Sequence, residues 1–111
     1  MKKLFILFVL LLLVGCSKDE GKLDIKKLMK ENEYIIVDVR TKSEYDESHI
    51  KDAINIPHDD IDENITIDKD KIIFVYCASG MRSNVAYKKL SSYGYEVYDL
   101  GSFNTIDLPK N

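Results

Sequence analysis

The chain has 111 residues, of which 45% are hydrophobic and 32% are charged, and these proportions are typical of a globular protein with a single domain. The net charge of −3 becomes −5, with 14 basic against 19 acidic residues, once residues 1–15 and their two lysines are removed. An acidic chain is a poor partner for nucleic acid, whose phosphates bind basic surfaces. The chain has two histidines and no cluster of metal-binding residue types, so we expect neither a metal nor a cofactor.

The N-terminus has the pattern of a lipoprotein signal peptide over residues 1–15. Two lysines precede the uncharged run Leu4–Val14, which is shorter than the roughly 20 residues that span a bilayer. The run ends in Leu-Val-Gly-Cys, which resembles the bacterial lipobox. A plain signal peptide and an uncleaved anchor are alternatives, but neither explains a cysteine directly after the run. We therefore expect Cys16 to be lipidated and to become the first residue of the mature chain.

This division makes residues 16–22 a lipidated cysteine with a short polar tether and residues 23–111 the folded domain. The domain would be exported and held on the non-cytoplasmic side of a bacterial membrane by its lipid anchor. Cys77 is then the only free thiol of the mature chain, which excludes an internal disulfide and a paired-cysteine redox mechanism. An unpaired thiol in an exported protein favours a reactive role.

The domain alternates predicted helices and strands. Uninterrupted apolar runs at 34–37 and 72–76 are typical of parallel strands that are buried on both faces. This alternation predicts an α/β fold with a mostly parallel sheet, helices on both faces, and ligand sites at the carboxyl ends of the strands. In chain order, we expect a helix at 23–30, a strand at 34–37, a helix at 41–47, a strand at 53–56, a helix at 58–65, a strand at 72–76, a helix at 83–93 and a strand at 95–100.

The segment Cys77–Ser83 reads Cys-Ala-Ser-Gly-Met-Arg-Ser and joins an apolar strand to a helix. Small residues let such a loop curl so that backbone N–H groups converge, and the helix N-terminus adds a positive dipole. Both features favour thiolate over thiol, which makes Cys77 a candidate nucleophile. Arg82 adds a permanent positive charge with several donors. A buried, inert cysteine is the alternative, and the composition of the loop argues against it.

An ordered series of motifs runs across the domain. The motifs are Asp38-Val39-Arg40, Glu44-Tyr45, His49-Ile50, Ala53-Ile54-Asn55-Ile56-Pro57 and the Cys77 loop. Together they resemble the rhodanese family of sulfurtransferases. This resemblance implies a small doubly wound α/β domain with a parallel sheet of about five strands. It also implies that Cys77 takes sulfur from a donor such as thiosulfate, forms a persulfide, and passes the sulfur to a thiol or cyanide acceptor.

The resemblance assigns roles to other residues of the domain. Cys77 and Arg82 are the expected catalytic residues, with Arg82 either binding the anionic donor or bracing the loop. Arg40 either faces the pocket and attracts anions or forms a structural ion pair with Asp38, and His49 is expected to be structural. The substrate-binding loop would contain Ala78, Ser79, Gly80, Met81 and Ser83.

The sequence departs from the family near its end, where Ser102 and Ile106 replace a glycine and a tryptophan. These changes are expected to alter the packing of the last helix or the closure of the pocket. Phosphatases of a related fold are a rival enzyme class, but their loops enclose five residues between cysteine and arginine, whereas Cys77 and Arg82 enclose four. A non-catalytic, membrane-tethered binding or sulfur-carrier module is the second alternative.

Overall fold

The computed structural model describes residues 24–111, so the predicted signal peptide and Cys16 lie outside the described residues. Within residues 24–111, none of the helices has the length and apolar character needed to cross a membrane. The elements are α2 (Ile25–Glu31), β1 (Tyr34–Asp38), α3 (Lys42–Glu47), β2 (Ile54–Asn55), the 3-10 turn η1 (His58–Asp60), β3 (Ile72–Cys77), α4 (Met81–Ser92), β4 (Glu96–Ser102) and the 3-10 turn η2 (Phe103–Thr105).

The four strands form one sheet in the order β2-β1-β3-β4, and every neighbouring pair is parallel. This confirms the predicted α/β class with a parallel sheet. The sheet has four strands rather than about five among the described residues. The C-terminal segment makes a single antiparallel bridge, between Ile50 and Lys110, which is too short to add a strand. The four strands predicted from the sequence therefore account for all of the strands that this part of the chain forms.

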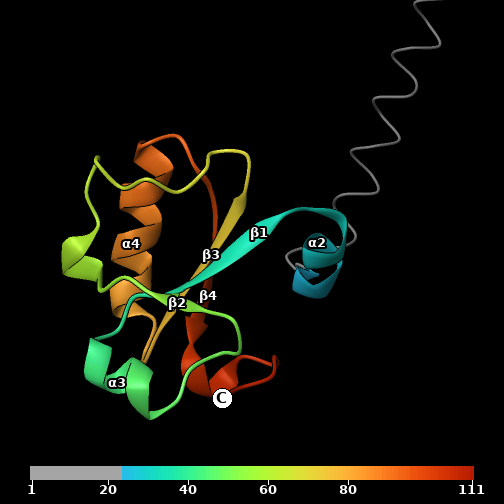
Figure 1. The fold of residues 1–111 in the computed structure, drawn as a ribbon, viewed down its shortest axis with the longest axis vertical. Coiled ribbons are helices and arrows are strands. Elements are labelled where there is room, and N and C mark those ends of the chain that lie inside the picture. The colour runs from blue at the N-terminus through green and yellow to red at the C-terminus, as the bar shows by residue number, and fades with distance from the viewer. Residues whose placement is uncertain (1–23) are drawn as a thin grey trace, which may run out of the picture.

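The central strand β3 separates two layers of the core. All six of its residues are buried, and its side chains alternate between the two faces of the sheet. Ile73, Val75 and Cys77 pack on the face that α4 covers, whereas Phe74 and Tyr76 pack on the other face. Figure 1 shows α4 and α2 on opposite sides of the sheet, so helices cover both faces as predicted.

The predicted helix at 58–65 is wrong, because only the 3-10 turn η1 forms there. The side chains of Asp62 and Asp68 accept hydrogen bonds from the backbone N–H groups of Asn64 and Asp70. Such local contacts stabilise turns and compete with the helix. The segment still covers the sheet, since the isoleucines between η1 and β3 pack on the same core layer as α4.

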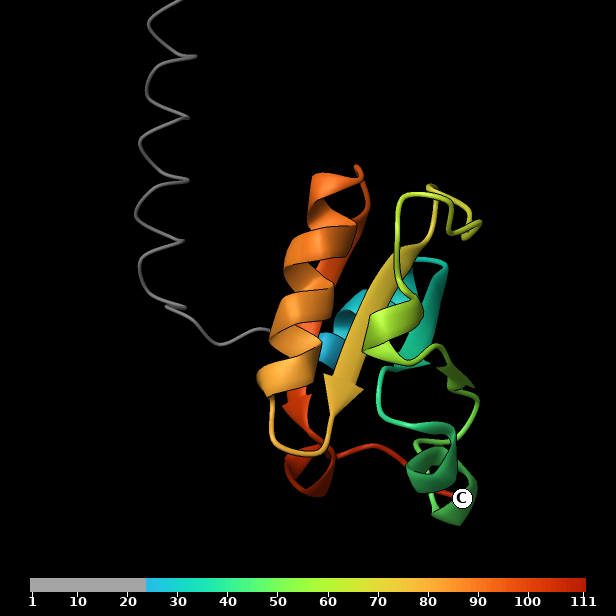
Figure 2. The ribbon, with the colours of Figure 1, turned by 90° about the vertical axis from the view of Figure 1, so that its left-hand side faces the viewer.

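Two helices begin and end as their local sequences require. The predicted helix at 41–47 forms as α3 and begins with a capping box, in which Thr41 and Glu44 each accept a hydrogen bond from the other's backbone. Helix α4 begins at Met81, two residues before the predicted start, after Gly80 at φ +100°. It ends before Gly94, whose φ of +98° favours glycine. The carboxyl ends of β3 and β4 and the helix α3 lie at the same end of the molecule (Figure 2).

Candidate active site

The sulfur of Cys77 lies in a cradle of backbone N–H groups. Cys77 is the last residue of β3 and is fully buried. Its Sγ accepts hydrogen bonds from the N–H groups of Gly80 at 2.9 Å and Ser83 at 3.2 Å. The left-handed conformation of Gly80 turns the chain back on itself, so that the first turn of α4 points its N–H groups at the sulfur. The structure therefore brings the predicted loop together around Cys77.

The cradle changes the acidity of the thiol. Burial alone raises the pKa of Cys77, but hydrogen bonds outweigh burial and hold this pKa below its ordinary value. The donors are the hydroxyl of Ser83 and the backbone N–H groups of Ser83, Gly80 and Ser79. The Ser83 Oγ lies 3.5 Å from the sulfur and 3.2 Å from the carbonyl oxygen of Gly80, so its proton can turn to either acceptor. The site is thus built to hold a thiolate.

The other residues of the predicted loop lie on the rim of the cradle. Ala78 and Ser79 are exposed, and Met81 is 76% exposed. The carbonyl oxygen of Ala78 accepts a hydrogen bond of 2.7 Å from the hydroxyl of Ser102, which lies at the end of β4. The loop therefore has an open outer side and is held from behind by the neighbouring strand.

Arg82 lies in the first turn of α4, directly before Ser83, and is paired with Glu44 of α3. Its two terminal nitrogens donate to the two carboxylate oxygens at 2.9 and 3.2 Å, which is the fork geometry that arginine favours. The Arg82 guanidinium, followed by the Thr41 backbone, lowers the pKa of Glu44 to about 2. The same pair raises the pKa of Arg82, to which the nearby Cys77 also contributes. Within residues 24–111 the side-chain hydrogen bonds of Arg82 go to α3, and its binding of an anionic donor stays a prediction.

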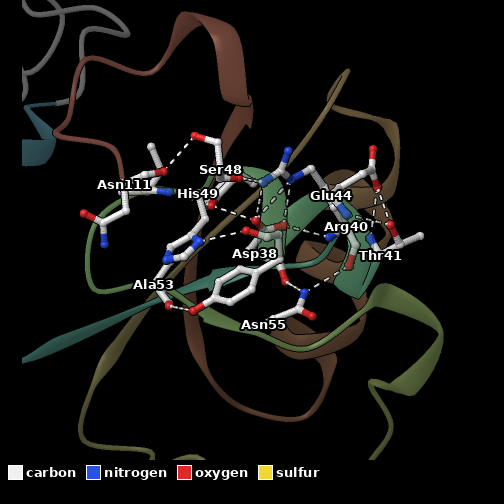
Figure 3. Close-up of polar contacts among 12 residues, drawn as sticks. Asp38, Arg40, Thr41, Glu44, Ser48, His49, Ala53, Asn55 and Asn111 are labelled. Atoms are coloured by element: carbon white, nitrogen blue, oxygen red, sulfur yellow. Dashed lines mark hydrogen bonds and ion pairs between the residues drawn. The ribbon is translucent and has the colours of Figure 1, made fainter.

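Arg40 lies in a second cluster at the end of β1, shown in Figure 3. It is 6% exposed, and its Nε and Nη2 atoms donate to the carboxylate of Asp38 at 2.7 to 3.1 Å. Nη2 also donates to the carbonyl oxygen of Ser48 at 2.6 Å. The guanidinium lies over the ring of Phe103, with 4.4 Å to the ring centroid. The structure thus places Arg40 in the predicted structural ion pair with Asp38, which was the alternative to a role in the pocket.

Tyr76 completes this buried cluster. Its hydroxyl donates to Asp38 at 2.8 Å and accepts from the N–H of Ile50 at 2.9 Å. Burial raises the pKa of Tyr76, so its hydroxyl stays protonated and continues to donate. The Nδ1 of His49 is 2.8 Å from the carbonyl oxygen of Tyr45, and the two rings stack on each other; its structural role stays a prediction that these contacts favour. The buried polar groups of Asp38, Arg40 and Tyr76 are therefore all paired within the protein.

Comparison with known proteins identifies the family. The sequence pattern of one family, described as Rhodanese-like domain, matches residues 22–106. The chain belongs to the rhodanese-like domain family. Thiosulfate sulfurtransferase PspE of Escherichia coli (strain K12) is 37% identical over 67% of this chain and 75% of its own length. A solved structure described as rhodanese with anions from E. coli is 35% identical, has a TM-score of 0.65, and covers 70% of this chain and 96% of its own.

Another relative carries a similar domain within a longer protein. A probable molybdopterin-synthase adenylyltransferase of Porphyra purpurea is 39% identical over 78% of this chain, but the match spans 25% of that protein. The rhodanese-like domain thus corresponds to a quarter of that relative and to three quarters of the E. coli sulfurtransferase.

Two residues of this rhodanese-like domain have contacts that sequence reasoning missed. The sequence places Glu44 in a motif and in a helix, but its pairing with Arg82 joins residues 38 positions apart. Ser102 is a departure from the family in the sequence, and in the structure its hydroxyl contacts the Cys77 loop. Ile106, the second departure, is buried in the core layer opposite α4, beside Tyr76 and near Phe103. No local sequence pattern predicts contacts of this kind.

Proposed function

We propose that this rhodanese-like domain is a sulfurtransferase that moves sulfane sulfur from a donor such as thiosulfate to a thiophilic acceptor through a persulfide on Cys77. The observation that carries the proposal is the Cys77 sulfur, which accepts N–H hydrogen bonds from Gly80 and Ser83 at the end of β3. Such a cradle stabilises negative charge on sulfur before and after the reaction.

The reaction has two steps, and both are nucleophilic displacements at sulfur. In the first step, the Cys77 thiolate attacks the outer sulfur of thiosulfate, a new S–S bond forms, and sulfite leaves with the electron pair of the bond that breaks. In the second step, a nucleophile such as cyanide or a thiolate attacks the outer sulfur of the persulfide. The Cys77 thiolate then leaves and is restored. Neither step needs a cofactor or an external oxidant.

Arg82 is the proposed partner for an anionic donor. Arginine has five N–H donors, and Glu44 engages one on each terminal nitrogen. The remaining donors can hold the sulfonate oxygens of thiosulfate while Glu44 fixes the direction of the side chain. The similar E. coli structure, described as rhodanese with anions, supports anion binding by a domain of this fold.

We also propose that the domain is exported and anchored to the membrane of a bacterial cell by a lipid on Cys16. The support is the lysine-led apolar run that ends in Leu-Val-Gly-Cys. The variant Cys16→Ala should release the domain from the membrane fraction on cell fractionation. If the processed variant stays with the membranes, the lipid anchor is wrong.

The sulfur transfer is tested by mass spectrometry on the full chain. After exposure to thiosulfate, the protein should gain the mass of one sulfur atom, and cyanide should remove it. Digestion should place the added sulfur on the peptide Ile72–Arg82 and not on the peptide that holds Cys16. If thiosulfate and a low-molecular-weight persulfide both leave Cys77 unchanged, a binding or carrier module becomes the better interpretation.

A further inference from the structure

The end of β4 is shifted so that Ser102 lies beside Cys77. The parallel register of β3 with β4 pairs Val75 with Asp99 but Tyr76 with Gly101, so Leu100 is an extra residue in the ladder. Gly101 has φ +84°, which favours glycine, and its N–H donates to the side chain of Asp99 at 2.9 Å. This bulge moves the register by one position, and Ser102 becomes the partner of Cys77.

The Ser102 hydroxyl reaches from this position to the loop that follows Cys77. It donates a hydrogen bond of 2.7 Å to the carbonyl oxygen of Ala78. The peptide bond between Ala78 and Ser79 is trans, and in a planar trans peptide the C=O and the N–H point in opposite directions. A contact that holds the Ala78 carbonyl toward β4 therefore holds the Ser79 N–H toward the opposite side of the peptide.

This peptide lies between Cys77 and Gly80, whose N–H donates to the Cys77 sulfur at 2.9 Å. The Ser79 N–H is also among the groups that lower the pKa of Cys77, together with those of Ser83 and Gly80. Ser83 lies in the first turn of α4, which begins at Met81 directly after Gly80. Ser79 lies outside the helix and is exposed, so its peptide needs another support. Among the hydrogen bonds of residues 24–111, the bond from Ser102 supplies it.

We propose that Ser102 is a positioning residue for the sulfur chemistry of this domain: its hydroxyl fixes the Ala78–Ser79 peptide, and with it the loop that directs the Gly80 N–H at the Cys77 sulfur. The inference rests on the proposed role of Cys77 as the nucleophile. It concerns the thiolate itself, so it can be tested without any sulfur donor or acceptor.

The test is the pH dependence of alkylation of Cys77 by iodoacetamide in the full chain, followed on the peptide Ile72–Arg82. Ser102→Ala and Ser102→Gly remove the hydroxyl, and Ser102→Thr keeps it. Ser102 has φ −87° and ψ 131°, an extended conformation that all of these residues adopt. Ser92→Ala is the matched control, because it removes a hydroxyl that donates to the Lys89 carbonyl at 2.6 Å near the C-terminal end of α4.

The alanine and glycine variants should move the midpoint of the alkylation profile upward by about half a pH unit, the effect of one modest hydrogen bond on a thiolate. The threonine variant and the Ser92→Ala control should keep the wild-type midpoint. The plateau at high pH reports access to the sulfur and separates this effect from a change in exposure.

Three outcomes would overturn the proposal. An unchanged midpoint in the alanine and glycine variants, even with a lower melting temperature, would make the bond purely structural. An equal shift in the threonine variant would show that the hydroxyl is not the cause. An equal shift in Ser92→Ala would show that the effect is not local. A failure of sulfur transfer in the wild-type chain would contradict the proposed function but would leave these midpoints unaffected.

Discussion

Buried polar residues lie at the ends of the neighbouring strands β1 and β3. The two ends differ in how they balance charge. At the end of β1, the carboxylate of Asp38 is matched by the guanidinium of Arg40 (Figure 3), and Tyr76 adds a further donor. At the end of β3, the Cys77 sulfur is surrounded by neutral donors from Gly80 and Ser83. The first cluster balances its own charge, whereas the second would stabilise the negative charge that comes and goes on sulfur in the proposed reaction. A position at a strand end is therefore not enough to make a reactive site.

The largest expected effect is on chemistry alone and comes from Cys77→Ser. The hydroxyl of serine is a much weaker nucleophile toward sulfur than a thiolate. The peptide that holds residue 77 should therefore gain no sulfur from thiosulfate. The melting temperature should be unchanged, because the substitution keeps the shape of the side chain. Sulfur gain at the wild-type rate in this variant would contradict the assignment of Cys77.

The next effect is on stability and comes from Arg40→Met. This change leaves the buried carboxylate of Asp38 without its cation, and it should cost about 3 kcal/mol in the free energy of unfolding by urea. The control Lys42→Met removes an exposed pair with Asp46 and should change stability far less.

The same Arg40→Met variant also tests whether the Asp38–Arg40 cluster is separate from the Cys77 cradle. Its folded fraction should still gain one sulfur atom, because Arg40 contacts Asp38 and Ser48 rather than the cradle. If fully folded Arg40→Met no longer accepts sulfur, then Arg40 belongs to the donor site and the two clusters are not separate.

The smallest effect is expected from Glu44→Gln, which keeps the helix-capping oxygen but removes the charge that pairs with Arg82. The folded pKa of Glu44 is about 2, below the ordinary 4.5, so the pair stabilises the fold above the ordinary pKa. This contribution is lost as the pH falls from about 4.5 through about 2. The variant should melt at a lower temperature than the wild type at pH 7, and the gap should close across that window.

The matched control for Glu44 is Asp46→Asn, which breaks the exposed pair with Lys42 on the same helix. It should lower the melting temperature less than Glu44→Gln at pH 7. A gap between wild type and Glu44→Gln that stays constant down to pH 2 would mean that the loss does not come from the charge of Glu44.

The parts of this structure that could be predicted from the sequence are those that depend on neighbours in the chain. Two apolar runs and the alternation of elements predict the four strands, and the spacing of Thr41 and Glu44 suits the cap of α3. The small residues after Cys77 gave the cradle. The parts that could not be predicted depend on tertiary approach. Glu44 meets Arg82 only because α3 and α4 begin at the same end of the sheet, and the bulge at Leu100 decides which residue of β4 faces Cys77.

One prediction was wrong for a local reason. The segment after Pro57 has spaced isoleucines that fit a helix, but Asp62 and Asp68 bind nearby backbone N–H groups and favour turns. Ile61 remains buried against the sheet. Burial pattern alone therefore does not separate a helix from a chain of turns that covers the same surface.

The complete burial of Cys77 has a consequence for selectivity by size. The sulfur has no exposed surface, although the adjoining residues Ala78 and Ser79 are exposed. Only a reagent with a narrow leading atom can reach it without moving the loop. A persulfide would add one more atom to a side chain that is already fully buried, so that atom must either project through the rim or widen the loop. Bulky thiol reagents should therefore react with Cys77 more slowly than small ones.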